Sequence, residues 1–95
     1  MKPKNVAYLK SLANHLEPSL TVGKGEIDET LLRAVNNALA AHELIKVRIL
    51  DTCGYDRKEV GAILAQGTGS ELISTIGRIV ILYKAKKEPV IRLPY

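Results

Sequence analysis

Residues 43–50, with the sequence ELIKVRIL, carry the clearest secondary-structure signal in this chain. Every second side chain in the stretch is a branched aliphatic one, namely Ile45, Val47 and Ile49. The side chains between them, which point to the opposite face of an extended chain, belong to Lys46, Arg48 and Leu50. This period of two predicts a strand with one face buried in a core.

A helix is predicted directly before this strand, ending at about His42. Its buried stripe recurs at helical spacing and consists of Leu31, Leu32, Val35, Ala38 and Leu39. Asp28 is expected to cap the helix, and Ile27 and Leu32 occupy the two positions of a hydrophobic staple. His42 is placed to meet the free carbonyl groups at the end of the helix.

A second helix is predicted directly after the strand, from Asp56 to about Gln66. Asp56 and Glu59 have the spacing of a capping box, in which Asp56 caps the helix and Glu59 reaches back. The inward residues are expected to be Val60, Ile63 and Leu64. Gly67 and Gly69 are expected to end this helix.

The two ends of the chain complete the order of elements. Residues 4–16 predict a helix, with an apolar stripe of Val6, Leu9, Leu12, Ala13 and Leu16. Pro18 stops this helix, and the short strand SLTV follows and ends at Gly23. Two strands, ELISTI and RIVILYK, form a hairpin around Gly77. The last residues of the chain are apolar and are expected to dock on the core.

This order predicts an α/β fold: helix, strand, helix, strand, helix, strand, strand. We expect a two-layer sandwich with a four-stranded mixed sheet, because helical connections favour parallel neighbours and the final hairpin is antiparallel. The length of 95 residues favours a single domain spanning 1–95.

Composition limits the classes of function. The net charge of +4 permits an anionic partner, and no apolar run reaches the roughly 18 residues of a membrane span. The N-terminal stretch lacks the unbroken apolar segment of a secretory signal, so a cytoplasmic protein is expected. The aromatic residues are four tyrosines, which are too few for a platform that stacks bases. An RNA partner would therefore be held by its backbone and shape.

Catalytic and metal-binding groups are not arranged in any recognisable pattern. Cys53 is the single cysteine, and no feature of the sequence brings it together with His42 and Asp56. His15 and His42 lack the spacing of zinc ligands. We therefore expect no enzymatic activity, no cofactor, no metal and no small-molecule substrate.

The stretch VGKGEID, residues 22–28, is the most specific local signal for binding. It lacks the spacing and the hydroxyl group of a nucleotide P-loop, which excludes that reading. Glycines ahead of a helix allow close approach of a phosphate to backbone amides. The same residues also fit an ordinary turn between a strand and a helix, and local sequence leaves both readings open.

Several segments resemble the signature of CRM domains, named for chloroplast RNA splicing and ribosome maturation. They are LKSLANHLEP (9–18), VG (22–23), AAHELIKVRI (40–49) and IGRIVILYK (76–84). The chain is most similar to the single-domain, YhbY-like bacterial members. This resemblance implies a fold like that of the C-terminal domain of translation initiation factor three. It also implies RNA binding and association with precursors of the large ribosomal subunit. The alternative is a protein–protein adapter on the ribosome.

The resemblance also implies where RNA would bind. The family loop Gly-x-x-Gly corresponds to Gly23, Lys24, Gly25 and Glu26, so that Glu26 stands in place of the second glycine. Further cations that would contact phosphate are Lys2, Lys4 and Lys10 near the start, and Lys84, Lys86 and Lys87 after the last strand. The loop also carries Asp28 and Glu29, and its local charge is negative. We therefore expect the lysines after the last strand to contribute more than Lys24, and Lys86 and Lys87 to be exposed.

Overall fold

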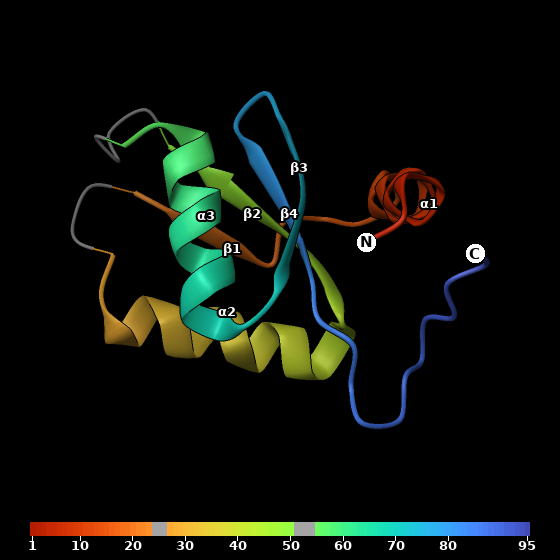
Figure 1. The fold of residues 1–95 in the computed structure, drawn as a ribbon. Helices are drawn as coiled ribbons and strands as arrows, with labels where there is room; N and C mark the ends of the chain where they lie inside the picture. Colours follow the sequence, from red (N-terminus) through yellow and green to blue (C-terminus); the bar gives the residue numbers. More distant parts are fainter. Residues whose placement is uncertain (24–26, 51–54) are drawn as a thin grey trace.

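The computed structural model describes residues 1–23, 27–50 and 55–95 of the chain. The predictions that concern Lys24, Gly25, Glu26 and Cys53 lie outside these residues. The elements are α1 (Pro3–Ala13), β1 (Leu20–Val22), α2 (Glu29–His42), β2 (Leu44–Ile49), α3 (Arg57–Thr68), β3 (Glu71–Ile76) and β4 (Ile79–Tyr83) (Figure 1). Their order confirms the predicted order of helices and strands.

The four strands form one mixed sheet in the order β1-β2-β4-β3. β1 and β2 are parallel and are joined through α2, whereas β4 is antiparallel to both β2 and β3. β4 is thus inserted between β2 and β3, the two strands that α3 connects. Gly77, with a φ of 58°, forms the predicted turn between β3 and β4.

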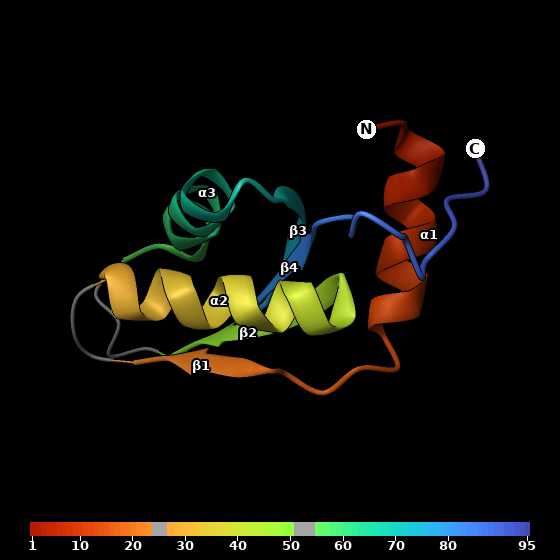
Figure 2. The same ribbon diagram turned by 90° about the horizontal axis from the view of Figure 1, so that it is seen from below.

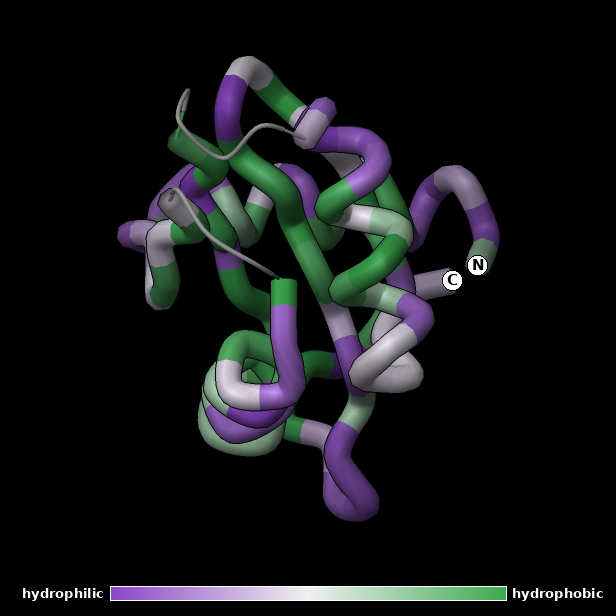
Figure 3. The backbone as a smooth tube through the Cα atoms, turned by 90° about the vertical axis from the view of Figure 1, so that its left-hand side faces the viewer, coloured by the Kyte–Doolittle hydropathy of each residue, from purple (hydrophilic) through white to green (hydrophobic). Residues whose placement is uncertain are grey.

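One face of the sheet packs against α2 and α3. The buried residues of this core are Val22, Val35, Leu39, Ile45, Val47, Ile49, Val60, Leu64, Val80 and Leu82. Ile45, Val47 and Ile49 lie on this face, as the alternation in residues 43–50 predicts. In Figure 3 the strands in the middle of the molecule are mostly hydrophobic, which fits a sheet with a buried face.

The opposite face of the sheet is covered at one end by α1. A second core joins Leu9 and Ala13 of α1 to Leu44, Ile73, Ile81 and Tyr83 of the sheet. α1 stands apart from α2 and α3, beside the C-terminal end of the described chain (Figure 2). The two-layer arrangement of the sheet with α2 and α3 therefore carries a partial third layer.

Four local expectations from the sequence are wrong. α1 ends at Ala13, and Leu16 lies beyond it with 39% of its side chain exposed. Asp56 stands at the N-cap of α3 but its side chain makes no capping hydrogen bond, so no capping box forms. Gly67 lies inside α3, and Gly69, with a φ of 69°, ends the helix alone.

The fourth error concerns the inward face of α3. Ile63 is exposed, because the buried residues of the helix are Val60, Gly61, Leu64 and Thr68. A Cβ atom at Gly61 would come within 2.9 Å of the Leu72 side chain, so the missing side chain lets α3 approach the sheet closely. Gly61 therefore belongs to the packed stripe, and Ile63 is turned to solvent.

Candidate nucleic-acid interface

Gly23 lies at the end of β1, where the parallel strands β1 and β2 finish side by side. The amide of Leu50 donates to the carbonyl of Val22 at 2.8 Å, which extends the pairing of the two strands to Gly23. A Cβ atom on Gly23 would lie 3.3 Å from Cδ1 of Leu50. A side chain at position 23 would therefore require a small movement of Leu50, which is partly exposed.

The start of α2, the next element after this loop, already holds a negative group. Oδ1 of Asp28 accepts a hydrogen bond of 3.0 Å from the amide of Leu31, as an N-cap does. The predicted cap is therefore confirmed. Because Asp28 and Glu29 place carboxylates at the positive end of the helix dipole, they compete there with a phosphate.

The lysines that follow β4 lie at the other end of the sheet from Gly23. Tyr83, the last residue of β4, pairs with Leu44 at the start of β2, whereas Val22 pairs with Ile49 at the end of β2. The predicted site residues are thus divided between two ends of the sheet. We call these the loop end, near Gly23, and the tail end, near Tyr83.

Two of the three lysines at the tail end bind helix carbonyls. Nζ of Lys84 donates to the carbonyl of Thr68 at 2.7 Å and to Oδ1 of Asn36 at 3.2 Å. Nζ of Lys86 donates to the carbonyl of Ala41 at 3.1 Å. These ammonium groups bind free carbonyl groups at the C-terminal ends of α3 and α2, where the helix dipole favours a positive charge. Part of their capacity for binding phosphate is therefore engaged.

The expectation that Lys86 is exposed is wrong, since its side chain is half-buried, whereas Lys87 is exposed. Lys84, Lys86 and Lys87 line one hollow of about 310 Å³ beside α2. In Figure 3 the segment after β4 is hydrophilic where it projects from the molecule. Lys87 is the one lysine of the three whose ammonium group binds no partner among the described residues.

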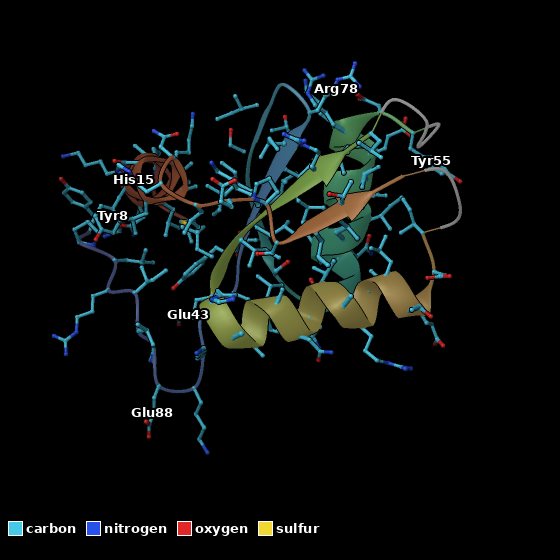
Figure 4. The ribbon with its side chains drawn as sticks, turned by 180° about the vertical axis from the view of Figure 1, so that it is seen from behind. Tyr8, His15, Glu43, Tyr55, Arg78 and Glu88 are labelled. Atoms are coloured by element: carbon cyan, nitrogen blue, oxygen red, sulfur yellow. The ribbon has the colours of Figure 1, made fainter. Side chains whose placement is uncertain are left out.

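Glu43 is a fully buried charged residue to which no pattern in the sequence assigns a role. Its carboxylate accepts three backbone hydrogen bonds from the C-terminal tail (residues 84–95). The donors are the amides of Lys86 at 2.9 Å and of Val90 and Ile91 at 2.7 Å each. Figure 4 shows Glu43 at the end of α2, above the tail that carries Glu88.

The electrostatics of Glu43 favour the ionised carboxylate. Burial acts to raise its pKa, but the backbone hydrogen bonds and the charge of Lys86 outweigh burial and hold the pKa below its ordinary value. The backbone of Glu43 has a φ of 64°, a conformation that favours glycine at the end of a helix. A signal was present in the sequence, because Glu43 stands between a predicted helix and a predicted strand, where a helix commonly ends at a glycine.

The tail also binds α1, which carries the other predicted lysines. Asn5, a buried residue of α1, exchanges two hydrogen bonds with the backbone of Tyr95, at 3.1 and 3.2 Å. Nζ of Lys4 lies 5.1 Å from the centre of the Tyr95 ring, which is a cation–π distance. Lys2 is exposed and Lys10 is half-buried. The apolar end of the tail docks as predicted, since Ile91 and Leu93 pack against the core under α1.

Other kinds of site find little support in the described residues. Within the ranges 1–23, 27–50 and 55–95 no group of three His, Cys, Asp or Glu side chains could hold a metal ion. None of the helices in those ranges is long and apolar enough to cross a membrane. Three tyrosines are exposed, but they lie on α1, before α3 and in the tail, and Tyr83 on the sheet is buried. They do not form a platform for stacking bases.

Comparison with known proteins connects this arrangement to a family. The "Probable RNA-binding protein YqeI" of Bacillus subtilis is 41% identical over 85 residues, which cover 90% of this chain and 88% of that protein. An "RNA-binding protein" of Haemophilus influenzae is 37% identical over 98 residues, covering 99% of this chain and 95% of its own. These names describe RNA-binding proteins and not enzymes.

A solved structure and a family model agree with these relatives. The solution structure of a hypothetical protein from Staphylococcus aureus, described as a candidate RNA-binding protein, superimposes with a TM-score of 0.82. It is 36% identical, and the match covers 99% of each chain. The model of the CRS1 / YhbY (CRM) domain matches residues 1–84. The chain therefore belongs to the CRS1/YhbY (CRM) domain family.

Proposed function

We propose that this protein binds structured RNA through the phosphate backbone and that it acts with precursors of the large ribosomal subunit. The observation that carries the proposal is the family match over residues 1–84, together with relatives that are named RNA-binding proteins. We further propose that residues 1–95 act as one RNA-binding unit in the cytoplasm, without enzymatic activity.

The physical basis of binding is charge without base stacking. The net charge is +4, and the exposed tyrosines are scattered, so phosphate contacts are the available source of affinity. At the loop end the proposed contacts are Gly23, Lys24, Gly25 and Glu26. At the tail end and on α1 they are Lys87, Lys86, Lys84, Lys2, Lys4 and Lys10.

The contacts at the tail end distinguish the three lysines there. Because Nζ of Lys86 binds the carbonyl of Ala41, Lys87 is the stronger candidate for a phosphate contact at the tail end. Loss of one phosphate contact flattens the log–log dependence of affinity on salt by about 0.9 for a duplex. Lys87→Ala is expected to show about this change, and Lys86→Ala about half of it or less.

The test is a salt titration of affinity for a base-paired RNA hairpin and for an unstructured oligonucleotide, by fluorescence anisotropy. The wild type, Lys24→Ala, Lys86→Ala and Lys87→Ala are compared, and circular dichroism confirms that each is folded. We expect steep salt dependence with the hairpin and little preference for sequence. Binding that does not depend on salt, or no binding, would contradict the proposal and favour the adapter.

The partner is tested separately in cells. A tagged chain is sedimented through a sucrose gradient, and crosslinked RNA from each fraction is sequenced. We expect the protein in fractions that contain large-subunit precursors. An RNA-binding protein found with mature messenger RNA instead would keep the binding activity and refute the proposed partner.

A further inference from the structure

The face of the sheet opposite α2 and α3 is covered at one end and open at the other. The covered end carries Leu44, Ile81 and Tyr83, which pack against α1. The strand residues on the remaining part of this face are Thr21, Lys46, Arg48, Ser74, Ile76 and Ile79, which we call the open sheet face. Ile79 forms its boundary, because it is half-buried and packs against the core under α1. In Figure 4 this part of β1 and β2 faces the viewer, with α1 to one side and α3 behind the sheet.

The pairing of the strands places these residues in register. Thr21 pairs with Arg48, Arg48 with Ile79, and Ile79 with Ile76, so one row crosses all four strands. Lys46 lies two residues from Arg48 on the central strand β2, about 6.6 Å away along the backbone. Both cations are thus fixed on a rigid element, unlike the lysines of the C-terminal tail.

Lys46 and Arg48 are not engaged in the way that the predicted lysines are. Neither side chain has a hydrogen-bond or ion-pair partner among the residues that the structure describes. Arg48 is exposed and Lys46 is half-buried. Glu71 is the one acidic strand residue described on this face, and it pairs with Tyr83 at the covered end. The open sheet face is therefore positively charged.

The open sheet face continues into the loop end. Gly23 and Leu50 follow Thr21 and Arg48 by two residues each, so they lie on the same face of the sheet. The hydrogen bond from the amide of Leu50 to the carbonyl of Val22 extends the ladder to this point. A polyanion that reaches Gly23 can therefore also contact Arg48 and Lys46 without leaving the surface.

The chemistry of the surface selects the backbone of RNA. No aromatic ring belongs to the open sheet face, so it cannot stack splayed bases. Its hydroxyl groups, on Thr21 and Ser74, and its two cations are groups that bind phosphate and ribose oxygens. We infer that the open sheet face binds the phosphodiester backbone of structured RNA, with Arg48 and Lys46 as the charged contacts. This inference rests on the proposed function and locates it on the sheet.

The test compares two double variants of equal charge. Lys46→Gln/Arg48→Gln removes two cations from the open sheet face and keeps most of each aliphatic stem. Arg33→Gln/Lys58→Gln removes two exposed cations from α2 and α3, on the other side of the sheet. Both variants lower the net charge from +4 to +2. The probe is the base-paired RNA hairpin, titrated with salt, and thermal unfolding shows whether each variant is folded.

The sheet variant is expected to flatten the log–log salt slope by about 1.5 to 2 and to weaken binding on the order of tenfold at low salt. The helix variant is expected to change the slope by less than about 0.5. The charge-preserving variant Lys46→Arg/Arg48→Lys should retain the wild-type slope, which separates lost charge from a disturbed strand.

The outcomes separate this inference from the proposed function. If the wild type binds the hairpin and the two double variants behave alike, the inference is overturned and the proposed function stands. If the wild type does not bind RNA, the proposed function fails first. If Lys46→Arg/Arg48→Lys loses as much RNA affinity as Lys46→Gln/Arg48→Gln, the strand was disturbed and the inference is also overturned.

Discussion

The tail end and the loop end of the sheet differ in how far their cations bind partners within the fold. At the tail end, the Glu43 carboxylate accepts three hydrogen bonds from backbone amides. Lys84 and Lys86 donate to carbonyl groups at the C-terminal ends of α3 and α2. At the loop end, Arg48 is exposed and has no partner among the described residues. The tail end contains more lysines, yet most of them hold the fold together.

This difference shows that the number of cations in a segment does not give the number available to a ligand. Residues 84–88 have the larger positive charge in the sequence, which is why they ranked first as a phosphate site. In the folded chain, two of the three lysines there are bound by carbonyl groups. Arg48 and Lys46 are separated in the sequence by Val47 and form a pair only because a strand turns both to one face.

The largest expected effect is from Glu43→Ala. The change removes the acceptor of three part-buried hydrogen bonds from the tail, and a hydrogen bond to a charged group contributes about 1.5–3 kcal/mol, less where the donor can bind water instead. We expect the free energy of unfolding to fall by about 3 kcal/mol, measured by urea denaturation. Glu88→Ala removes the same charge from an exposed residue of the tail and should change the stability by less than about 0.5 kcal/mol.

Equal stability of Glu43→Ala and Glu88→Ala would contradict a stabilising role for the buried carboxylate at the tail end. A fall in RNA affinity for Glu43→Ala, with the loop end intact, would show in addition that the fixed tail contributes to binding.

The next effect is loss of stability in acid. The pKa of Glu43 is lowered in the folded protein from its ordinary value of 4.5, because backbone amides and Lys86 outweigh the effect of burial. Its contribution to stability is therefore complete above pH 4.5 and is lost as the pH falls towards the lowered pKa. Chemical denaturation between pH 3 and 7 should show a shallower loss for Glu43→Gln than for the wild type. Identical pH profiles would mean that another carboxyl group controls the acid transition.

A smaller effect is expected from Asn5→Ala, which removes both hydrogen bonds between α1 and Tyr95. We expect a loss of about 1–2 kcal/mol in the free energy of unfolding, since each such bond contributes about 1 kcal/mol. Asn14→Ala, at an exposed position just after α1, is the control. If amide hydrogen exchange in Asn5→Ala is faster than in the wild type within α1 but not within α2, the loss of stability is located at the tail end. Uniformly faster exchange would contradict that location.

The smallest effect on stability is expected from Gly23→Ala. The new Cβ atom would meet the side chain of Leu50 at 3.3 Å, and Leu50 is 40% exposed and can move aside. We expect a change within about 0.5 kcal/mol in thermal unfolding. Gly61→Ala is the same substitution at a buried position of α3, where the Cβ atom would lie 2.9 Å from Leu72 and 3.3 Å from the fully buried Val80, and it should cost about 1–2 kcal/mol. A large loss for Gly23→Ala would show that the loop end is as tightly packed as the interior.

The sequence predicts much of the fold because its patterns are local. The alternation in residues 43–50 places the buried face of β2, and the Asp28 cap places the start of α2. The errors arise where packing competes with pattern. Ile63 has the correct spacing for an inward residue of α3, but Gly61 gives closer contact with the sheet and is buried instead.

The contacts of the tail could not be predicted, because they join residues far apart in the chain. Glu43 and Lys86 are separated by 43 residues, and Asn5 and Tyr95 by 90. Neither Glu43 nor Asn5 belongs to a local motif, because the donors that each side chain binds lie far away in the sequence. The loop end is placed by parallel pairing, which the sequence did indicate. The charges around it are assigned to a binding surface only after the faces of the sheet are known.

The hydrogen bonds between Asn5 and Tyr95 have a mechanical consequence. A force that pulls the two ends of the described chain apart acts first on α1 and the tail, which hold each other at the ends. The strands β2 and β4, which pair through five residue pairs in the middle of the sheet, feel that force only after α1 and the tail have separated. An optical-trap experiment should therefore record two ruptures: a weak one that frees both ends, and a stronger one that opens the sheet.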